Sequence, residues 1–101
     1  MSRKLDTHAE QLAALGHPAR LAILRHAVQA GTDGAAVGDI QSKLDIPGST
    51  LSHHIDRLSR VGLLQSRREG TFIYYSPVFP ALRVLTDYLW EDCCKGGKGC
   101  C

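Results

Sequence analysis

Apolar residues recur every three or four positions through the first half of the chain, which is the spacing of one face of an α-helix. The pattern predicts a first helix that stops at Gly16, with an apolar face formed by Leu5, Ala9, Leu12 and Leu15. A second helix is expected from His17-Pro18 to Ala30-Gly31, because proline is tolerated in a first turn. Its predicted apolar face is formed by Leu21, Leu24 and Val28.

Two shorter helices are expected after a turn at residues 31–34. The first, over residues 37–44, has Val37, Ile40 and Leu44 on one side and is broken by the segment around Pro47. The second starts at residue 47 or 49 and ends at Val61, with Gly62 as its stop and with a buried face of Leu51, Ile55 and Leu58. Two short helices joined by such a turn predict a helix-turn-helix.

Beyond Gly62 the pattern changes from helical to alternating. Residues 63–68 and 71–76 predict two strands joined by Glu69-Gly70, and this hairpin is the only sheet that we expect. A fifth helix follows Pro77 and ends near Glu91, with an apolar stripe of Val78, Leu82, Leu85 and Leu89. The predicted fold is mainly α with a small β-hairpin: a winged helix-turn-helix with about five helices and a two-stranded wing.

A chain of 101 residues is enough for one domain. We expect residues 1–92 to form a DNA-binding and dimerisation domain, and residues 93–101 a flexible, cysteine-rich, ligand-binding tail with a mobile segment at 95–99. No apolar run approaches the roughly 20 residues that a membrane span needs, so we expect no membrane partner. The charged N-terminus lacks the apolar stretch of a secretory signal, which favours the cytoplasm, where thiols are kept reduced.

The net charge of +2 is confined to one segment of the chain. Residues 1–46 and residues 77–101 each carry equal numbers of basic and acidic side chains. Residues 47–76 hold four arginines against Asp56 and Glu69, so the whole excess lies in the fourth helix and the hairpin. A basic patch there is a modest signal for a nucleic-acid-binding face.

The second helix of a helix-turn-helix enters the major groove of DNA. Its predicted exposed face offers hydroxyl, imidazole and guanidinium groups, which suit base edges and phosphates. The candidate DNA-binding residues on it are Ser49, Thr50, Ser52, His53, Arg57 and Arg60. Arg67 and Arg68 of the hairpin are expected to contact the neighbouring phosphate backbone or minor groove. His53 and His54 point about 100° apart, so they cannot readily bind one metal ion together. Rather than a metal role, we expect His53 on the DNA face and His54 packed or hydrogen-bonded near the core.

The runs LAALGHPARLAILR, GSTLSHHIDRLSRVGLL and QSRREGTFIYYSP closely resemble the ArsR/SmtB family of metal-responsive winged-helix repressors. The resemblance covers roughly residues 8–90. It implies a homodimer that binds a palindromic double-stranded operator and leaves it when a metal or metalloid ion binds. One departure is Gly48, where many members have a glutamine that can read adenine.

Two ion sites that are common in this family are absent here. The third helix reads AVGDI where an arsenic site resembles CVCDL, and residues 81–91 lack the histidines of the fifth-helix zinc site. A subset of arsenic-responsive members carries C-C-x5-C at the end of the fifth helix, and the spacing here carries that site onto Cys93, Cys94 and Cys100, with Cys101 as a substitute. Soft thiolates suit As(III) or Sb(III), which we expect as the inducer, with no organic cofactor.

Other interpretations of the tail remain open. The thiols could bind Cd(II) or Zn(II), although adjacent cysteines fit zinc-finger spacing poorly, or could sense oxidants or persulfides, or could do nothing. An enzyme is not expected, because the chain has no cofactor motif and no acid, base or nucleophile cluster. A thiol-based metal-handling, redox or interaction protein without DNA binding is the remote alternative.

Overall fold

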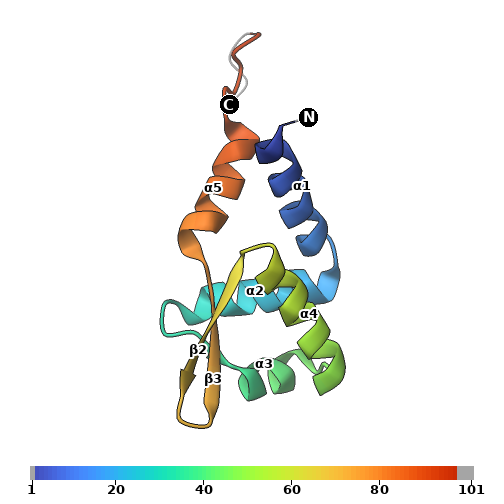
Figure 1. The fold of residues 1–101 in the computed structure, drawn as a ribbon, viewed down its shortest axis with the longest axis vertical. Helices are drawn as coiled ribbons and strands as arrows, with labels where there is room; N and C mark the ends of the chain where they lie inside the picture. Colours follow the sequence, from blue (N-terminus) through green and yellow to red (C-terminus); the bar gives the residue numbers. More distant parts are fainter. Residues whose placement is uncertain (1, 98–101) are drawn as a thin grey trace.

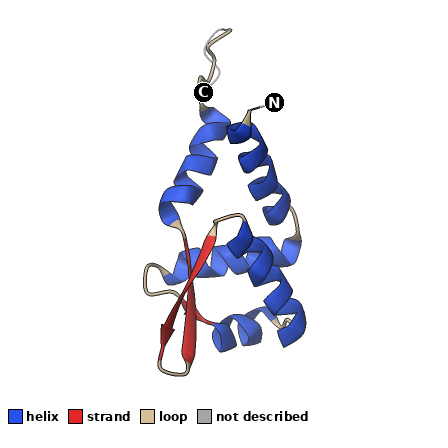
Figure 2. Cartoon of the chain, in the orientation of Figure 1, coloured by secondary structure: helices blue, strands red, loops and turns tan. Residues whose placement is uncertain are grey.

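The computed structural model describes residues 2–97. Its elements follow the predicted order, with one additional strand, β1 (Figures 1 and 2): α1 (Arg3–Leu15), α2 (Pro18–Ala30), β1 (Ala35–Ala36), α3 (Val37–Leu44), α4 (Gly48–Arg60), β2 (Leu64–Glu69), β3 (Phe72–Pro77) and α5 (Phe79–Trp90). The helices α2, α3 and α4 and the small sheet form one unit, from which α1 and α5 rise as two arms that converge at the chain ends. The mainly α fold with a winged helix-turn-helix is therefore confirmed.

The predicted helix starts have clear local causes. The Ser2 hydroxyl accepts a hydrogen bond from the Leu5 amide at 3.1 Å, which satisfies an amide in the first turn of α1. The His17 Nδ1 atom does the same for the Ala19 amide at 3.1 Å, and Pro18 occupies the first turn of α2. The chain therefore turns between α1 and α2 within two residues.

The core lies between α2, α3, α4 and the sheet. As predicted, α4 buries Leu51, Ile55 and Leu58, and α3 buries Ile40. The faces predicted for the first two helices are correct only in part. Leu24 of α2 is buried and Leu15 of α1 packs against the core as predicted, but α2 exposes Leu21 and Val28 and buries Ile23 and Ala27. Helix α1 exposes Leu5 and Leu12 and buries His8, Gln11 and Ala14. Both helices have apolar residues on more than one face, so periodicity alone cannot select the face that packs.

The sheet has three strands in the order β1-β3-β2, not two. The extra strand, β1, pairs Ala35 with Tyr75 and Ala36 with Tyr74, and two residues are too few to show an alternating pattern. The hairpin turn also differs from the prediction by one position. Glu69 pairs with Phe72, so the loop is Gly70-Thr71, with Gly70 at φ +62°.

Replacing Gly34 by Ala is expected to destabilise the fold by more than about 1–2 kcal/mol, the usual cost of a left-handed backbone conformation for a residue with a Cβ. Gly34 has φ +86°, and a Cβ atom there would lie 2.9 Å from the Tyr75 carbonyl oxygen of β3. Urea unfolding measures the loss. Gly31→Ala is the matched control, because Gly31 also has positive φ (+79°) but nothing within 4 Å of a Cβ. Equal losses in the two variants would show that the contact with β3 is unimportant.

Among residues 2–97 no helix is both long enough and apolar enough to cross a membrane.

Candidate nucleic-acid interface

The helix-turn-helix is formed by α3 and α4, which are held by a tight turn. Asp45 adopts a left-handed conformation (φ 52°) that ends α3, and the Ile46 amide donates to the Gln41 carbonyl at 3.3 Å. Pro47 then caps α4, and its carbonyl accepts from the Leu51 amide at 2.8 Å. Since Leu51 and Leu58 are almost fully buried, they fix the rotation of α4 and hence the face that it turns outward.

Every predicted α4 candidate lies on the exposed side of the helix: Ser49, Thr50, Ser52, His53, Arg57 and Arg60. The two arginines differ in their surroundings. Arg60 Nε pairs with Asp56 Oδ2 at 2.9 Å, whereas Arg57 makes no ion pair or hydrogen bond with the described residues. Arg57 is therefore the less compensated positive charge on this face of α4.

His54 is separated from His53 as predicted. It is half-buried, its ring centroid lies 4.7 Å from that of His17, and its Nδ1 lies 3.4 Å from Arg20 Nη1. Arg20 itself donates to the Ala14 carbonyl. Desolvation lowers the pKa of His54, and the neighbouring charges of His17, Arg20 and His53 lower it further. A neutral His54 therefore joins the recognition helix α4 to the corner between α1 and α2.

Acidification is expected to weaken the fold through His54. Because its pKa is lowered in the folded chain, the folded state binds fewer protons than the unfolded state between the two pKa values. The stability that neutral His54 provides is fully present above its unfolded pKa of about 6.5 and is lost as the pH falls through the lower folded pKa. Urea unfolding at pH values about one unit above and below 6.5 measures this loss. It should be smaller in His54→Gln, and an equal loss in both proteins would refute the assignment.

The two wing arginines have different roles. Arg67 pairs with Glu69, donates to the Asp33 carbonyl at 2.8 Å, and lies 4.8 Å from the centre of the Tyr74 ring. These contacts tie β2 to the loop before β1, so Arg67 is engaged within the wing. Arg68 is exposed and makes no ion pair or hydrogen bond with the residues described in the structure. Of the predicted pair, Arg68 is thus the one available for a phosphate.

Two further residues at this face were not predicted. Phe72, beside the hairpin turn, is 60% exposed, which is unusual for an aromatic ring. Gln41 of α3 has its amide nitrogen 3.6 Å from where a Cβ of residue 48 would lie, so it supplies a polar group beside the first turn of α4. The hairpin-tip position signals Phe72, but no spacing pattern signals Gln41, since its position depends on how α3 meets α4.

The predicted ion-binding tail is described only in part. After α5, the chain makes successive turns, with amide hydrogen bonds from Cys93 to Trp90 (2.9 Å) and from Lys95 to Asp92 (3.0 Å). The Cys93 and Cys94 sulfurs lie 3.5 Å apart, and neither is a free thiol in the structure. Cys100 and Cys101 lie outside the described residues.

Within residues 2–97, no group of three or more His, Cys, Asp or Glu side chains is placed to hold a metal ion. In the reduced protein the two described cysteine sulfurs are close enough to share an ion. With an ion–sulfur bond of about 2.3 Å, sulfurs 3.5 Å apart subtend an angle of about 100° at the ion. Any third sulfur must come from outside the described segment.

The fold and this face define a winged helix-turn-helix DNA-binding protein. The family of helix-turn-helix domains matches residues 15–67. An uncharacterised HTH-type transcriptional regulator of Methanocaldococcus jannaschii is 36% identical over 72 residues, which cover 71% of this chain and 79% of that protein. A putative arsenical resistance operon repressor of Halobacterium salinarum is 33% identical over 75% of this chain and 63% of its own length.

Solved structures agree with the sequence matches. A homodimeric winged helix-turn-helix domain from Mycobacterium bovis, described as a possible ArsR-family regulator, is 30% identical with a TM-score of 0.67 and covers 90% of this chain and 93% of its own. Reduced HlyU from Vibrio cholerae is 26% identical with a TM-score of 0.70, and the match covers 91% of this chain and 94% of that one. The chain belongs to the ArsR family of winged-helix transcriptional regulators. It is a DNA-binding regulator and, as predicted, not an enzyme.

Proposed function

We propose that the chain is a homodimeric cytoplasmic repressor that As(III) or Sb(III) releases from its operator by binding Cys93, Cys94 and a third thiol from Cys100 or Cys101. The observation that carries the proposal is a pair of cysteine sulfur atoms at the end of α5, 3.5 Å apart, on a DNA-binding chain that lacks two other ion sites of the family; the proposal concerns the reduced form of these cysteines. Three soft sulfurs suit a pyramidal metalloid ion. The likeness to an arsenical resistance repressor supports this choice of inducer.

Dimerisation is supported by the apolar surface of α1 and α5. The leucine face of α1 is turned outward, and α5 exposes Val84, Leu89 and Trp90, of which Trp90 is 67% exposed. Exposed apolar residues grouped in this way mark an interaction site. A second copy is the partner that we propose, because the M. bovis neighbour is homodimeric. Two copies present two recognition helices to the two halves of a palindromic operator.

Release follows from coupling between the two sites. An ion at the end of α5 would reorder the turns after Trp90 and shift α5 within the dimer, which changes the spacing of the two α4 helices. Because operator half-sites lie about one helical turn apart, a changed spacing lowers the affinity for DNA. The coupling is reciprocal, and values of about 1–3 kcal/mol, or 5- to 150-fold in affinity, are usual.

We propose that the exposed arginines contact phosphates on the operator. Replacing Arg57 or Arg68 by Ala should therefore weaken binding to all duplexes alike. Each lost phosphate contact should lower the slope of log affinity against log salt by about 0.9, once per protomer. Fluorescence anisotropy over a salt series gives the slope, with the exposed Arg25→Ala of α2 as the matched control. If the variant keeps the parent's salt slope, the replaced arginine does not contact a phosphate.

A second candidate is thiol-redox sensing, in which two thiols lose two protons and two electrons to a peroxide or persulfide and form a disulfide. It is favoured by the absence of free thiols at Cys93 and Cys94 in the structure. The Vibrio cholerae neighbour is described in a reduced form, which is in line with redox chemistry on this fold.

Direct ion binding tests the proposal. Arsenite is titrated into the reduced protein, and the sulfur-to-arsenic ultraviolet absorption is followed together with the number of thiols that remain reactive. We expect saturation at one ion per chain with three thiols protected. No absorption change, with all thiols still reactive, would reject the metalloid site and leave redox sensing as the candidate.

A further inference from the structure

The buried face of α1 carries a chain of polar contacts that the proposed function does not explain. His8 and Gln11 are each only 6% exposed, although a histidine and a glutamine are rarely buried unless their polar atoms are satisfied. Their ring and amide lie 2.9 Å apart, from His8 Nδ1 to Gln11 Oε1. The Gln11 amide nitrogen donates to the Val61 carbonyl at 3.1 Å, so its Oε1 accepts and His8 Nδ1 carries the proton.

Val61 gives this contact its functional position. It is the residue that ends the recognition helix α4, where backbone carbonyls have no partner within the helix. Gln11 supplies a donor to that carbonyl from another helix, 50 residues away in the sequence. A displacement of α1 along its axis would therefore break this bond, and the C-terminal end of α4 would lose its contact with Gln11.

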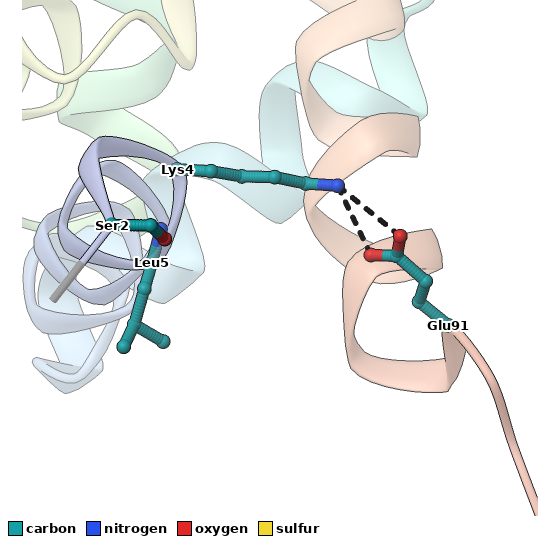
Figure 3. A network of polar contacts seen from close by, with 4 residues as sticks. All are labelled: Ser2, Lys4, Leu5 and Glu91. Atoms are coloured by element: carbon teal, nitrogen blue, oxygen red, sulfur yellow. Dashed lines mark hydrogen bonds and ion pairs between the residues drawn. The ribbon is translucent and has the colours of Figure 1, made fainter. Parts of the chain in front are cut away.

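At its other end the same chain of contacts reaches the C-terminal end of α5. The His8 ring lies 4.4 Å from the ring of Tyr88 in α5, and Lys4 Nζ lies 5.2 Å from that ring. Lys4 also pairs with both carboxylate oxygens of Glu91, at 3.1 and 3.3 Å (Figure 3). Glu91 ends α5, two residues before Cys93. The contacts therefore run from Glu91, two residues before Cys93, to Val61 at the C-terminal end of α4.

We propose that His8 and Gln11 are positioning residues that couple the thiol end of α5 to the C-terminal end of α4. The proposal rests on the proposed function, because it assigns to these residues the transmission of inducer binding. Reordering at Cys93 and Cys94 would first break the exposed ion pair between Lys4 and Glu91. The resulting shift of α1 would then alter the buried contacts that link His8 through Gln11 to Val61 at the end of α4.

The test compares Gln11→Met with Gln29→Met. Methionine keeps the length of the side chain and removes both hydrogen bonds of Gln11, whereas Gln29 is an exposed glutamine of α2. Affinity for a duplex of the chain's own promoter is measured with and without arsenite. The parent and Gln29→Met should lose affinity 5- to 150-fold on adding arsenite. Gln11→Met should bind arsenite as the parent does and change its DNA affinity by less than about twofold.

His8→Phe is the second variant, in case Gln11→Met does not fold. It keeps a ring against Tyr88 and loses the bond to Gln11, and it should lose the response in the same way. If either folded variant binds arsenite and keeps the parent response, the proposal is wrong.

A reciprocal experiment separates this inference from the choice of inducer. Alkylation of Cys93 and Cys94 by iodoacetamide is timed in the reduced proteins, with and without the promoter duplex. The duplex should change the rate in the parent and in Gln29→Met but not in Gln11→Met, because coupling acts in both directions. If arsenite does not release the parent from DNA and yet the alkylation rates show this pattern, arsenite is rejected as the inducer and the coupling through His8 and Gln11 stands. If the duplex leaves the alkylation rate of the parent's cysteines unchanged, the proposed coupling is wrong.

Discussion

A Val84→Glu variant is expected to be monomeric and to bind the operator about 10²- to 10⁴-fold more weakly than the parent, the usual gain from linking two binding modules. Val84 is 53% exposed on α5, on the apolar surface that we assign to the second copy. A carboxylate there must either stay in water, which keeps the copies apart, or be buried without a partner at high cost. Each monomer would then engage one half-site alone.

Sedimentation gives the mass of this variant, and anisotropy on a full operator and on a single half-site gives its affinities. The half-site affinity should match that of the parent, since α4 and the wing are untouched. Val28→Glu is the matched control, as Val28 is an exposed valine that lies on α2 and not on α1 or α5. A Val84→Glu protein that remains dimeric would place the interface elsewhere.

Replacing Cys94 by Ser is expected to abolish release by As(III), so that the 5- to 150-fold effect of a typical coupled ligand falls to about onefold. Serine keeps the size of the side chain but replaces a soft thiolate with a hydroxyl that binds metalloids poorly. Cys94 also adopts a left-handed backbone (φ 65°) in the turn that brings its sulfur to that of Cys93. The reading face on α4 is distant, so affinity for DNA without the ion should be unchanged.

Anisotropy titrations with arsenite check this prediction, with Lys95→Ser as a neighbouring change that removes a charge but no sulfur. The control should be released as the parent is. Undiminished release of the Cys94→Ser protein would show that the ion binds elsewhere.

Local signals predicted much of the fold. The α4 face was predictable because its polar and apolar residues separate cleanly, so burial of Leu51 and Leu58 leaves little choice of rotation. The caps at Ser2 and His17 depend on neighbouring residues only. The strand β1 was missed because Ala35 and Ala36 become a strand through pairing with β3, which is far away in the sequence.

The polar interior of α1 was the least predictable feature. Leu5 and Leu12 suggest a core-facing stripe, yet the chain buries His8 and Gln11 and turns the leucines outward. Within one chain this choice looks unfavourable. It is explained if a second copy covers the leucines, because then both faces of α1 are used. The roles of Arg67 and Arg68 were likewise inseparable from sequence, since Arg67 is engaged by Asp33 and Tyr74 from other segments.

The most direct test of the metalloid-released repressor is fluorescence anisotropy of the reduced protein on a duplex of its own promoter, titrated separately with As(III), Sb(III), Cd(II), Zn(II) and a peroxide. We predict salt-dependent binding and release by As(III) or Sb(III) at near-stoichiometric levels. Release by the peroxide alone, or by Cd(II) or Zn(II) alone, would contradict the proposed inducer.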